Sequence, residues 1–526
     1  MVAEGLGSAQ PEATSGEMLK KQLRWYDPFA MIFAAGVAVF ITLGFTMAEL
    51  GTWGAMLVAG IVAVIALFQN VLWAEMAAMF PNKVGGITLF ANEAWKRRFQ
   101  PIGALSTFGY WCGWSLVLGV FGIGLGSLVQ AQWFPTVTWA WGTPWGVKLG
   151  LPQVIAVGAV LLAWIMNIIG IRIAAWVSWA LAAAFGVVVA IFLFAPFIGG
   201  LWHASNISWH ISSTWHGPTG IQSVLVWLYV VGWSVYPSEM PATFAPEYRD
   251  TVKDTRRGLA ACGIAYLLLW VILPMTTAGA VGDKFIAQDP ASFGVAAFNK
   301  IVGGGAGVAV AIMCAAIFVT MIAGSADASR ALYGMALDRM TLKQLVHLNR
   351  RGMPSRALTV DAVVNSLIIL FVANLLSVLL VANLGYFIAI IAALVGYIFL
   401  RKDQAGKPRE IQLPRGWTVV AVVLSVVNAL FLFEGVTNPG LTGYGSLRTT
   451  LIAVAILAIS LVLFWYRRVV QDRRTGGIRI AEPDNAIDTD ISLLQDANLE
   501  SAKNRAADTA TRRSNAELEI PGPAAD

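Results

Sequence analysis

SVLVWLYVVGWSVYPSEMPATFAPEYRDTVKDTRR, at residues 223–257, begins as an apolar helix and ends in a charged run. Between these parts, Gly232-Trp233-Ser234 is followed closely by Pro237 and Pro241. A membrane helix with Gly and Pro near its middle cannot keep every backbone hydrogen bond. Because lipid does not satisfy the freed groups, the pattern predicts an interrupted helix that faces protein or a cavity. Such interruptions mark binding sites in transporters, and the alternative is a proline kink without a ligand.

The composition indicates a polytopic α-helical membrane protein. Of the 526 residues, 57% are hydrophobic and 13% are charged, whereas an ordinary soluble protein has about 25% charged residues. Apolar blocks of about 20 residues recur, which is the length of a helix that crosses a bilayer, and the strand-length alternation of a membrane barrel is scarce. The basic residues behind the net charge of +6 lie in loops, so we expect no nucleic-acid partner.

The apolar blocks predict twelve spans in a lipid bilayer. They lie approximately at residues 27–48, 53–79, 101–130, 152–170, 174–199, 221–241, 258–281, 305–335, 357–378, 380–400, 417–436 and 449–467. From about residue 475 the chain is polar and lacks the apolar surface that offsets the entropy of ordering, which predicts a disordered tail.

Lys and Arg residues gather in alternate loops between the predicted spans. One set of loops is rich in them, as at residues 96–98, 249–257 and 350–356, and the other set holds few. The positive-inside rule therefore places both termini in the cytoplasm of a protein of the inner or plasma membrane.

The residues predict no metal site and no cofactor. His203, His210 and His216 share one outer loop, but their spacing fits no standard ligand pattern. The three cysteines lie in apolar segments, where they are expected to act as small core residues.

The first predicted span also has an irregular centre. Small residues occupy positions 34–38, and Gly36 permits local unwinding. An opened helix would present amide groups at a half-helix N-terminus, which attracts a carboxylate. The alternative is close helix packing by small residues. The two irregular centres lie five spans apart, as an inverted repeat predicts.

Carboxylates within the predicted spans are functional candidates, because an ionisable group at such depth is unfavourable. Glu239 is the strongest, with a structural role as hydrogen-bond acceptor as its alternative. Asp327 lies three residues before Arg330, and this spacing predicts an intrahelical pair. Glu75 is at the end of a span and is interpreted as interfacial structure.

Several motifs resemble, in chain order, those of the amino acid–polyamine–organocation (APC) transporters. They are residues 36–40 (GVAVF), residues 73–81 (WAEMAAMFP) with Gly85-Gly86 and Glu93-Ala94, residues 167–170 (NIIG), Glu239 with the charged loop after it, residues 329–338 (SRALYGMALD) and residues 349–354 (NRRGMP). They extend from about residue 36 to residue 354.

The resemblance implies a LeuT-like fold, in which five spans are followed by an inverted repeat of five more. Residues 26–200 would form the first repeat, residues 201–402 the second, and residues 403–470 two additional helices. Residues 1–25 and 471–526 would be cytoplasmic tails. Alternating access would move spans 1, 2, 6 and 7 against a scaffold of spans 3, 4, 8 and 9.

The resemblance also implies a central substrate site. The backbone would bind the substrate carboxylate at Ala35, Gly36, Val37, Ala38 and Val39, and its amino group at Val231, Gly232, Trp233 and Ser234. Tyr110 and Trp114 would be walls, and Trp233, Tyr386 and Phe387 would be gates. For the aromatic walls and Trp233, helix packing is the alternative. A cationic or aromatic substrate would suit the face of Trp233.

The coupling ion is left open between a proton and Na⁺. Glu239, Ser325 and Asp327 are the candidate coupling residues, and Ser325 with Thr320 would offer hydroxyl ligands to Na⁺. The predicted fifth span lacks the Lys that replaces sodium in some family members. Val37 and Ala38 also replace the usual Ser and Gly, which implies a more apolar site.

These features together predict a permease that imports an amino acid or a related amine, with a proton as the first choice of coupling ion. The alternatives are an exchanger, a Na⁺-coupled symporter and a transporter-like nutrient sensor that signals through its tail. No paired acid and base or metal set points to an enzyme. The protein is expected to be a monomer or a homodimer.

Overall fold

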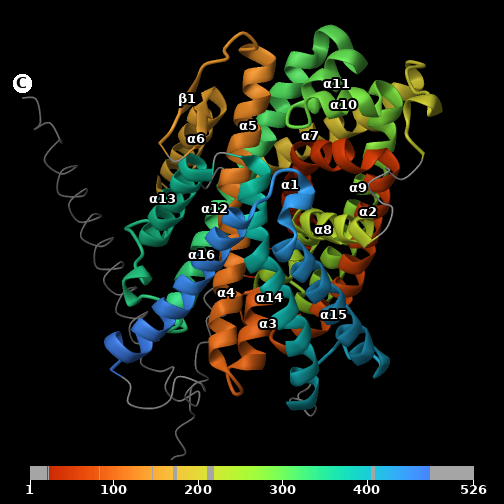
Figure 1. The fold of residues 1–526 in the computed structure, drawn as a ribbon. Helices are drawn as coiled ribbons and strands as arrows, with labels where there is room; N and C mark the ends of the chain where they lie inside the picture. The colour runs from red at the N-terminus through yellow and green to blue at the C-terminus, as the bar shows by residue number, and fades with distance from the viewer. Residues whose placement is uncertain are drawn as a thin grey trace, which may run out of the picture.

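The computed structural model describes residues 21–473, apart from residues 22, 82, 84, 145, 170–173, 210–217, 373 and 404–408. The predicted tail from residue 475 and two residues of the histidine loop, His210 and His216, therefore lie outside the described residues. The helices are α1 (Tyr26–Ala35), α2 (Ala38–Met79), α3 (Gly86–Trp95), α4 (Gln100–Ser115), α5 (Val117–Trp133), α6 (Leu151–Ile169), α7 (Ala174–Ile198), α8 (Pro218–Val235), α9 (Thr251–Val281), α10 (Asp283–Gln288), α11 (Phe293–Val302), α12 (Ala306–Leu337), α13 (Ser355–Val372), α14 (Leu375–Asp403), α15 (Gly416–Thr437) and α16 (Leu447–Tyr466) (Figure 1).

Shorter elements connect these helices. They are the strands β1 (Ala140–Gly142) and β2 (Lys148–Gly150), the 3-10 helices η1 (Ala204–Asn206), η3 (Tyr236–Glu247), η4 (Gly303–Gly305), η5 (Lys343–Leu345) and η6 (Pro439–Thr442), and the π-helix η7 (Arg467–Gln471). The two strands pair antiparallel between α5 and α6, with Trp141 opposite Leu149.

Nine helical segments in the described part of the chain are long and apolar enough to cross a membrane. Three of them are composite, because α4 continues into α5, α11 continues through η4 into α12, and α16 continues into η7. The prediction of a polytopic all-helical membrane protein is therefore confirmed. The number of twelve spans and the inverted repeat remain predictions.

Helix α2 carries parts of the first two predicted spans. Its 42 residues would extend about 63 Å if they were straight, which is roughly twice the hydrocarbon thickness of a bilayer. The helix instead bends at Gly51, whose φ of 71° is a conformation that glycine adopts without strain. Asp283 holds the bend, because its Oδ2 accepts the backbone N–H groups of Thr52 at 3.2 Å and Ser208 at 3.1 Å.

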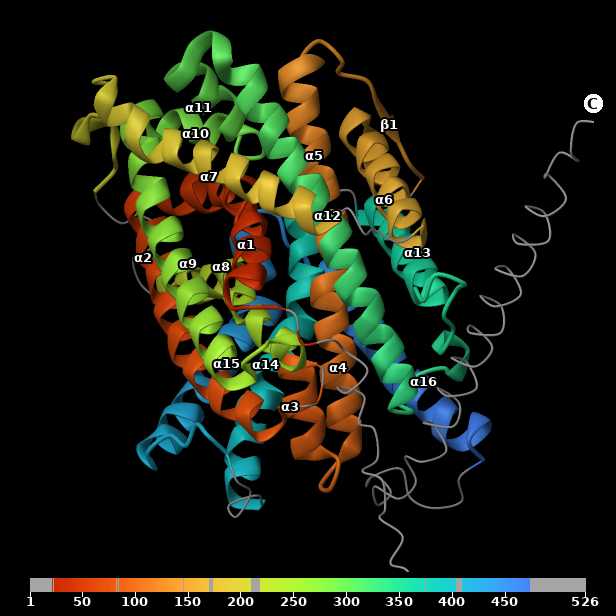
Figure 2. The same ribbon diagram turned by 180° about the vertical axis from the view of Figure 1, so that it is seen from behind.

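The helices form two packed groups. Helix α2 packs against α8 and α9, and α5 and α12 pack against α6 and α13. Helix α14 contacts α4, α5, α8 and α15, and it therefore joins the groups. Figures 1 and 2 show α6 and α13 side by side on one flank, α10 and α11 at one end of the bundle, and α3 toward the other end.

Large apolar side chains are exposed along the outer helices. They include Val360, Val363 and Leu367 on α13, Val419, Val426 and Phe433 on α15, and Leu451, Ile459 and Val462 on α16. An apolar surface of this extent marks contact with a membrane or another protein. Because these helices are long enough to cross a bilayer, lipid is the natural cover for this surface.

Candidate substrate site

Helix α8 is interrupted at Tyr236, slightly later than the predicted position. The helix continues through Gly232, Trp233 and Ser234 to Val235, and η3 begins at Tyr236. The reason is that Pro237 has no backbone N–H and disfavours the α conformation of the residue before it. Gly232 alone does not break the helix, because glycine only weakens a helix.

The first interruption separates α1 from α2, as the small residues predicted. Gly36 and Val37 lie between the two helices. The phenol of Tyr266, on α9, donates a hydrogen bond of 3.0 Å to the carbonyl of Ile32 near the end of α1. The hydroxyls of Thr42 and Ser234 are 3.1 Å apart and connect α2 to α8. The two interrupted helices therefore contact each other beside their breaks.

A cavity of about 30 Å³ lies between the two interruptions. Its wall consists of Ala35, Ala38, Gly113, Trp114, Val117, Phe121, Trp233, Ser234, Pro237, Tyr266, Thr320 and Tyr386. Ligand pockets usually hold roughly 300 Å³ or more. A substrate would therefore have to displace parts of this wall, because the cavity is too small to hold it.

The indole of Trp233 reaches a third, one-residue interruption, at Leu116 in the otherwise continuous α4–α5 segment. Leu116 separates α4 from α5, and the Trp233 Nε1 donates to the carbonyl of Gly113 just before this point, at 3.2 Å. The Trp233 ring also meets Phe121 edge to face, with ring centroids 6.2 Å apart. This hydrogen bond and ring contact hold the indole between α8 and the α4–α5 segment.

Glu239 lies behind the cavity wall and is 2% exposed. Tyr110 and Tyr386 each donate a hydrogen bond of 3.1 Å to its Oε1. Its Oε2 is buried and has no hydrogen-bond partner in the described part of the chain. Because Tyr386 also lines the cavity, this carboxyl is one side chain away from the site.

Five of the predicted substrate residues line the cavity, namely Ala35, Ala38, Trp114, Trp233 and Ser234, and so does the predicted gate residue Tyr386. The others, Gly36, Val37, Val39, Tyr110, Val231, Gly232 and Phe387, are not part of its wall. Phe387 lies behind α8, where its ring packs at a tilt against those of Tyr229 and Tyr236, with ring centroids 4.9 and 5.4 Å apart.

The predicted coupling residues on α12 do not lie at one common site. Thr320 lines the cavity, whereas Ser325 faces the buried Asp361 of α13. Asp327 interacts electrostatically with Glu239. The predicted partner, Arg330, acts electrostatically on Asp327, but no ion pair within 4 Å joins the two among the described residues. Arg330 donates to the carbonyl of Ala326 at 2.9 Å.

Sequence reasoning missed several residues of the wall. Val117, Phe121 and Pro237 are ordinary apolar residues of a span, and Tyr266 carries no motif. Asp361 was also missed, although an acidic residue within a predicted span is the same signal that selected Glu239.

Helices α4 and α14 pack closely against each other at positions occupied by glycine. A Cβ at Gly385 would lie 2.6 Å from the carbonyl oxygen of Gly109, and one at Gly113 would lie 2.9 Å from the Tyr386 Cβ. Since α4 carries Tyr110 and Trp114 and α14 carries Tyr386, this approach positions both sides of the site.

Gly385→Ala is expected to lower the free energy of unfolding by about 1–3 kcal/mol, as overpacking of a close contact does. Gly334→Ala is the matched control, because Gly334 is also within a helix and a Cβ there meets nothing within 4 Å. The control should stabilise the protein by about 0.5–1 kcal/mol. The measurement is the free energy of unfolding of both purified variants. Equal changes in Gly385→Ala and Gly334→Ala would contradict the role of the glycine contact.

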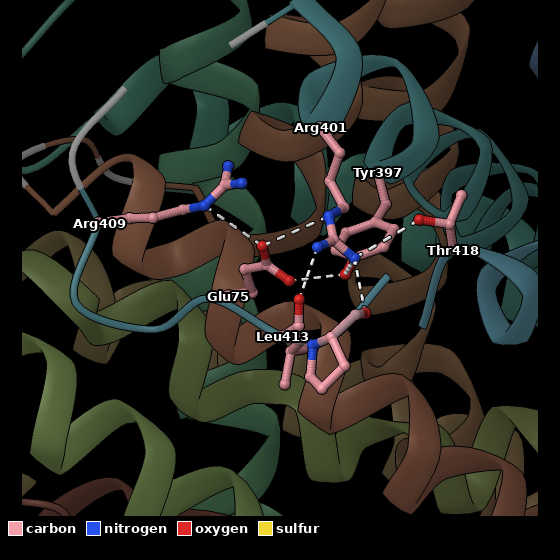
Figure 3. Close-up of polar contacts among 7 residues, drawn as sticks. Glu75, Tyr397, Arg401, Arg409, Leu413 and Thr418 are labelled. Atoms are coloured by element: carbon pink, nitrogen blue, oxygen red, sulfur yellow. Dashed lines mark hydrogen bonds and ion pairs between the residues drawn. The ribbon is translucent and has the colours of Figure 1, made fainter. Parts of the chain in front are cut away.

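Glu75 lies near the end of α2, as predicted, and is completely buried within the protein. Its Oε2 accepts a hydrogen bond of 2.6 Å from Tyr397, and its Oε1 lies 3.3 Å from the Arg409 Nε and 3.7 Å from the Arg401 Nε. Figure 3 shows the carboxylate between Arg409 on one side and Arg401 with Tyr397 on the other. Arg401 also donates to the carbonyl of Leu413 at 2.6 Å. This cluster, the Glu75 cluster, ties α2 to α14 and to the segment before α15.

Glu93 of α3 forms ion pairs with Lys83 at 2.8 Å and Lys96 at 2.9 Å. Burial raises the pKa of this carboxyl, but the positive charges of Lys96 and Lys83 together lower it by more. The pKa of Glu93 therefore lies below its usual value. The ion pairs therefore stabilise α3 at neutral pH and are lost only as the pH falls through this lowered value.

The fold and the site define a class: a polytopic helical membrane protein with a small cavity where two of its membrane helices are interrupted. The chain belongs to the amino acid permease family, whose model matches residues 23–473.

Three curated proteins illustrate the relationship. The chain is 25% identical over 380 residues to the amino-acid permease RocE of Bacillus subtilis (strain 168), covering 70% of this chain and 76% of that protein. It is 24% identical over 379 residues to the lysine-specific permease LysP of Escherichia coli (strain K12), covering 68% and 73%. It is 23% identical over 339 residues to the histidine permease HisP of Lactococcus lactis subsp. cremoris (strain MG1363), covering 62% and 68%.

Proposed function

We propose that this protein imports an amino acid by alternating access and couples the movement to protons. The observation that carries the proposal is the small cavity at the interruptions of α1–α2 and α8–η3, with the buried carboxyl of Glu239 directly behind its wall. Interrupted helices of transporters bind substrate in this way. Buried intramembrane carboxyls are typical of proton relays.

The helix ends suit the two charged groups of an amino acid. Helix α2 begins at Ala38, and its N-terminus carries partial positive charge for the substrate carboxylate. Helix α8 ends at Val235, and its C-terminal carbonyls carry partial negative charge for the amino group. Ala38 and Ser234 at these ends both line the cavity. The backbone thus recognises the part that all amino acids share.

The side chain of the substrate would meet a wall without charges. Trp233, Phe121 and Val117 are apolar, and the described residues of the wall include no Asp, Glu, Lys or Arg. A charged side chain would lack a counter-charge there, so we propose a neutral substrate as the first choice. A basic amino acid is the second choice, because the names of two relatives specify lysine and histidine. For such a substrate, Glu239 beyond Tyr386 would supply the carboxylate.

The test is uptake of labelled amino acids by proteoliposomes that contain the purified full chain. Neutral aromatic, neutral aliphatic and basic amino acids and an amine are supplied with an inward proton gradient, with a sodium gradient, or with neither. We expect uptake driven by the proton gradient, with neutral substrates preferred. Uptake that requires substrate inside the vesicle would instead identify an exchanger, and uptake driven by sodium alone would identify a Na⁺ symporter. Binding without uptake under every condition would contradict transport and favour a sensor.

A further inference from the structure

Asp361 is a second buried carboxyl, on the far side of α4–α5 from the cavity. It lies on α13 and is 0% exposed. Its Oδ1 accepts a hydrogen bond from the hydroxyl of Ser115, and Ser325 of α12 faces the same carboxyl. Its Oδ2 is buried without a hydrogen-bond partner among the described residues.

Asn365, one helical turn further along α13, joins this carboxyl to the interruption between α4 and α5. Its Nδ2 donates to the Ser115 hydroxyl at 3.0 Å and to the Asp361 carbonyl at 2.9 Å. Its Oδ1 accepts the backbone N–H of Gly119 at 3.0 Å. Ser115 and Gly119 lie on the two sides of Leu116, so both ends of the interruption are bonded to one turn of α13.

Asp361 has no compensating positive charge among the residues that the structure describes. In the described part of the chain, no Lys, Arg or His forms an ion pair with it, and α5 and α6 carry no titratable residue. The titratable group that interacts with it is the thiol of Cys112 on α4. On α12 the group that faces it is the Ser325 hydroxyl. A buried carboxylate without a compensating positive charge is strongly unfavourable. The Asp361 carboxyl is therefore stable here with a bound proton or cation.

The surrounding atoms favour a proton over a metal cation. A hard cation needs several oxygen ligands. Asn365 turns its amide nitrogen toward Ser115, and its oxygen is already used by Gly119. Apart from the carboxyl itself, the side-chain oxygens at the site are then the two hydroxyls of Ser115 and Ser325. A proton needs no such shell.

The interruption also connects Asp361 to the cavity. Trp114 and Val117, which flank Ser115 and Leu116, both line the cavity, and the carbonyl of Gly113 accepts the Trp233 indole. The α4–α5 interruption therefore carries the cavity wall on one face and the Asp361 hydrogen bonds on the other. A change in the charge of Asp361 would strengthen or weaken the hydrogen bond from Ser115. It would thereby affect the position of Trp114 and Val117, which line the cavity.

We propose that Asp361 is a second proton-binding site, which is loaded and emptied in each transport cycle and positions the α4–α5 interruption against the cavity. The proposal rests on the proposed function for the use of the proton, but the protonation of Asp361 is testable without transport. Its consequence is that two protons, one at Glu239 and one at Asp361, move with each substrate.

The first test is infrared titration of the purified full chain in nanodiscs without substrate. We expect the band of a protonated carboxyl that disappears at high pH, is missing in Asp361→Asn and persists in Glu239→Gln. A spectrum of Asp361→Asn that matches wild type across the titration would overturn the proposal. Disappearance of the Asp361 band when NaCl replaces KCl at constant pH would also overturn it, because Na⁺ would then occupy the site. These outcomes do not depend on whether the protein transports anything.

A second pair of variants covers the case in which Asp361→Asn does not fold. Ser115→Ala removes a hydrogen bond to the carboxyl, and we expect it to move the midpoint of the Asp361 band. Ser329→Ala is the matched control, because this buried serine on α12 bonds to the carbonyl of Ala326 instead. Equal midpoints in both variants would overturn the assignment of the band.

The transport test uses proteoliposomes clamped at zero voltage with an inward gradient of one pH unit. One coupled proton then contributes about a factor of ten to the accumulation ratio. We expect Asp361→Asn to lose about this factor while substrate exchange at equal pH continues. Unchanged accumulation in Asp361→Asn would overturn the role in the cycle, whereas failure of wild type to accumulate any substrate would contradict the proposed function itself.

Discussion

Glu239→Gln is expected to reduce substrate accumulation under a gradient of one pH unit by about tenfold, the factor that one coupled proton contributes. Glutamine keeps the shape of the side chain and still accepts hydrogen bonds from Tyr110 and Tyr386, but it cannot exchange a proton. Exchange of labelled for unlabelled substrate at equal pH should continue, because it needs no net proton movement. The measurement is uptake and exchange in the same proteoliposomes.

Tyr110→Phe is the control that separates the proton from the hydrogen bond. It removes one of the two donors to Glu239 but keeps the carboxyl and the second donor, Tyr386. This variant should keep gradient-driven accumulation. Accumulation by Glu239→Gln at the wild-type ratio would show that this carboxyl is a structural acceptor only. Loss of exchange together with accumulation would show that it acts in substrate binding.

Glu75→Ala is expected to have the largest effect on stability. The substitution leaves Arg401 and Arg409 without their buried carboxylate and removes the acceptor of Tyr397 (Figure 3). Breaking a buried ion pair by removing one partner costs about 3–5 kcal/mol. Unfolding of the purified protein in a detergent mixture would measure the change.

The matched control is Asp403→Ala, at the same end of α14. Asp403 pairs with Arg98 at 2.6 Å, but both side chains are 36% exposed. A surface pair of this kind contributes about 0–1 kcal/mol, so this variant should unfold close to wild type. A loss in Glu75→Ala no larger than in the control would mean that the Glu75 cluster does not hold α2 and α14 together.

The sequence alone determined the class of the protein and two of the places where its helices break, around Gly36 and at Pro237, but not the interruption at Leu116. Long apolar blocks are helical in a bilayer because each backbone group must bond within its own segment. Pro237 ends α8 through its missing N–H, and the small residues around Gly36 permit the gap between α1 and α2. These are local covalent properties, which is why they can be predicted from the chain in order. The count of twelve spans, the coupling ion and the substrate stay predictions.

Only the tertiary structure decided which side chains meet. Tyr397 reaches Glu75 across 322 positions of the chain, and Ser115 reaches Asp361 across 246. Nothing local in the sequence distinguishes Tyr266 in the cavity wall from an ordinary tyrosine of a span. Such contacts depend on which faces of the helices pack together and at what height, and that follows from the packing of all the helices at once. For this reason Phe387 lies behind α8, and Ser325 turns to Asp361 instead of the cavity.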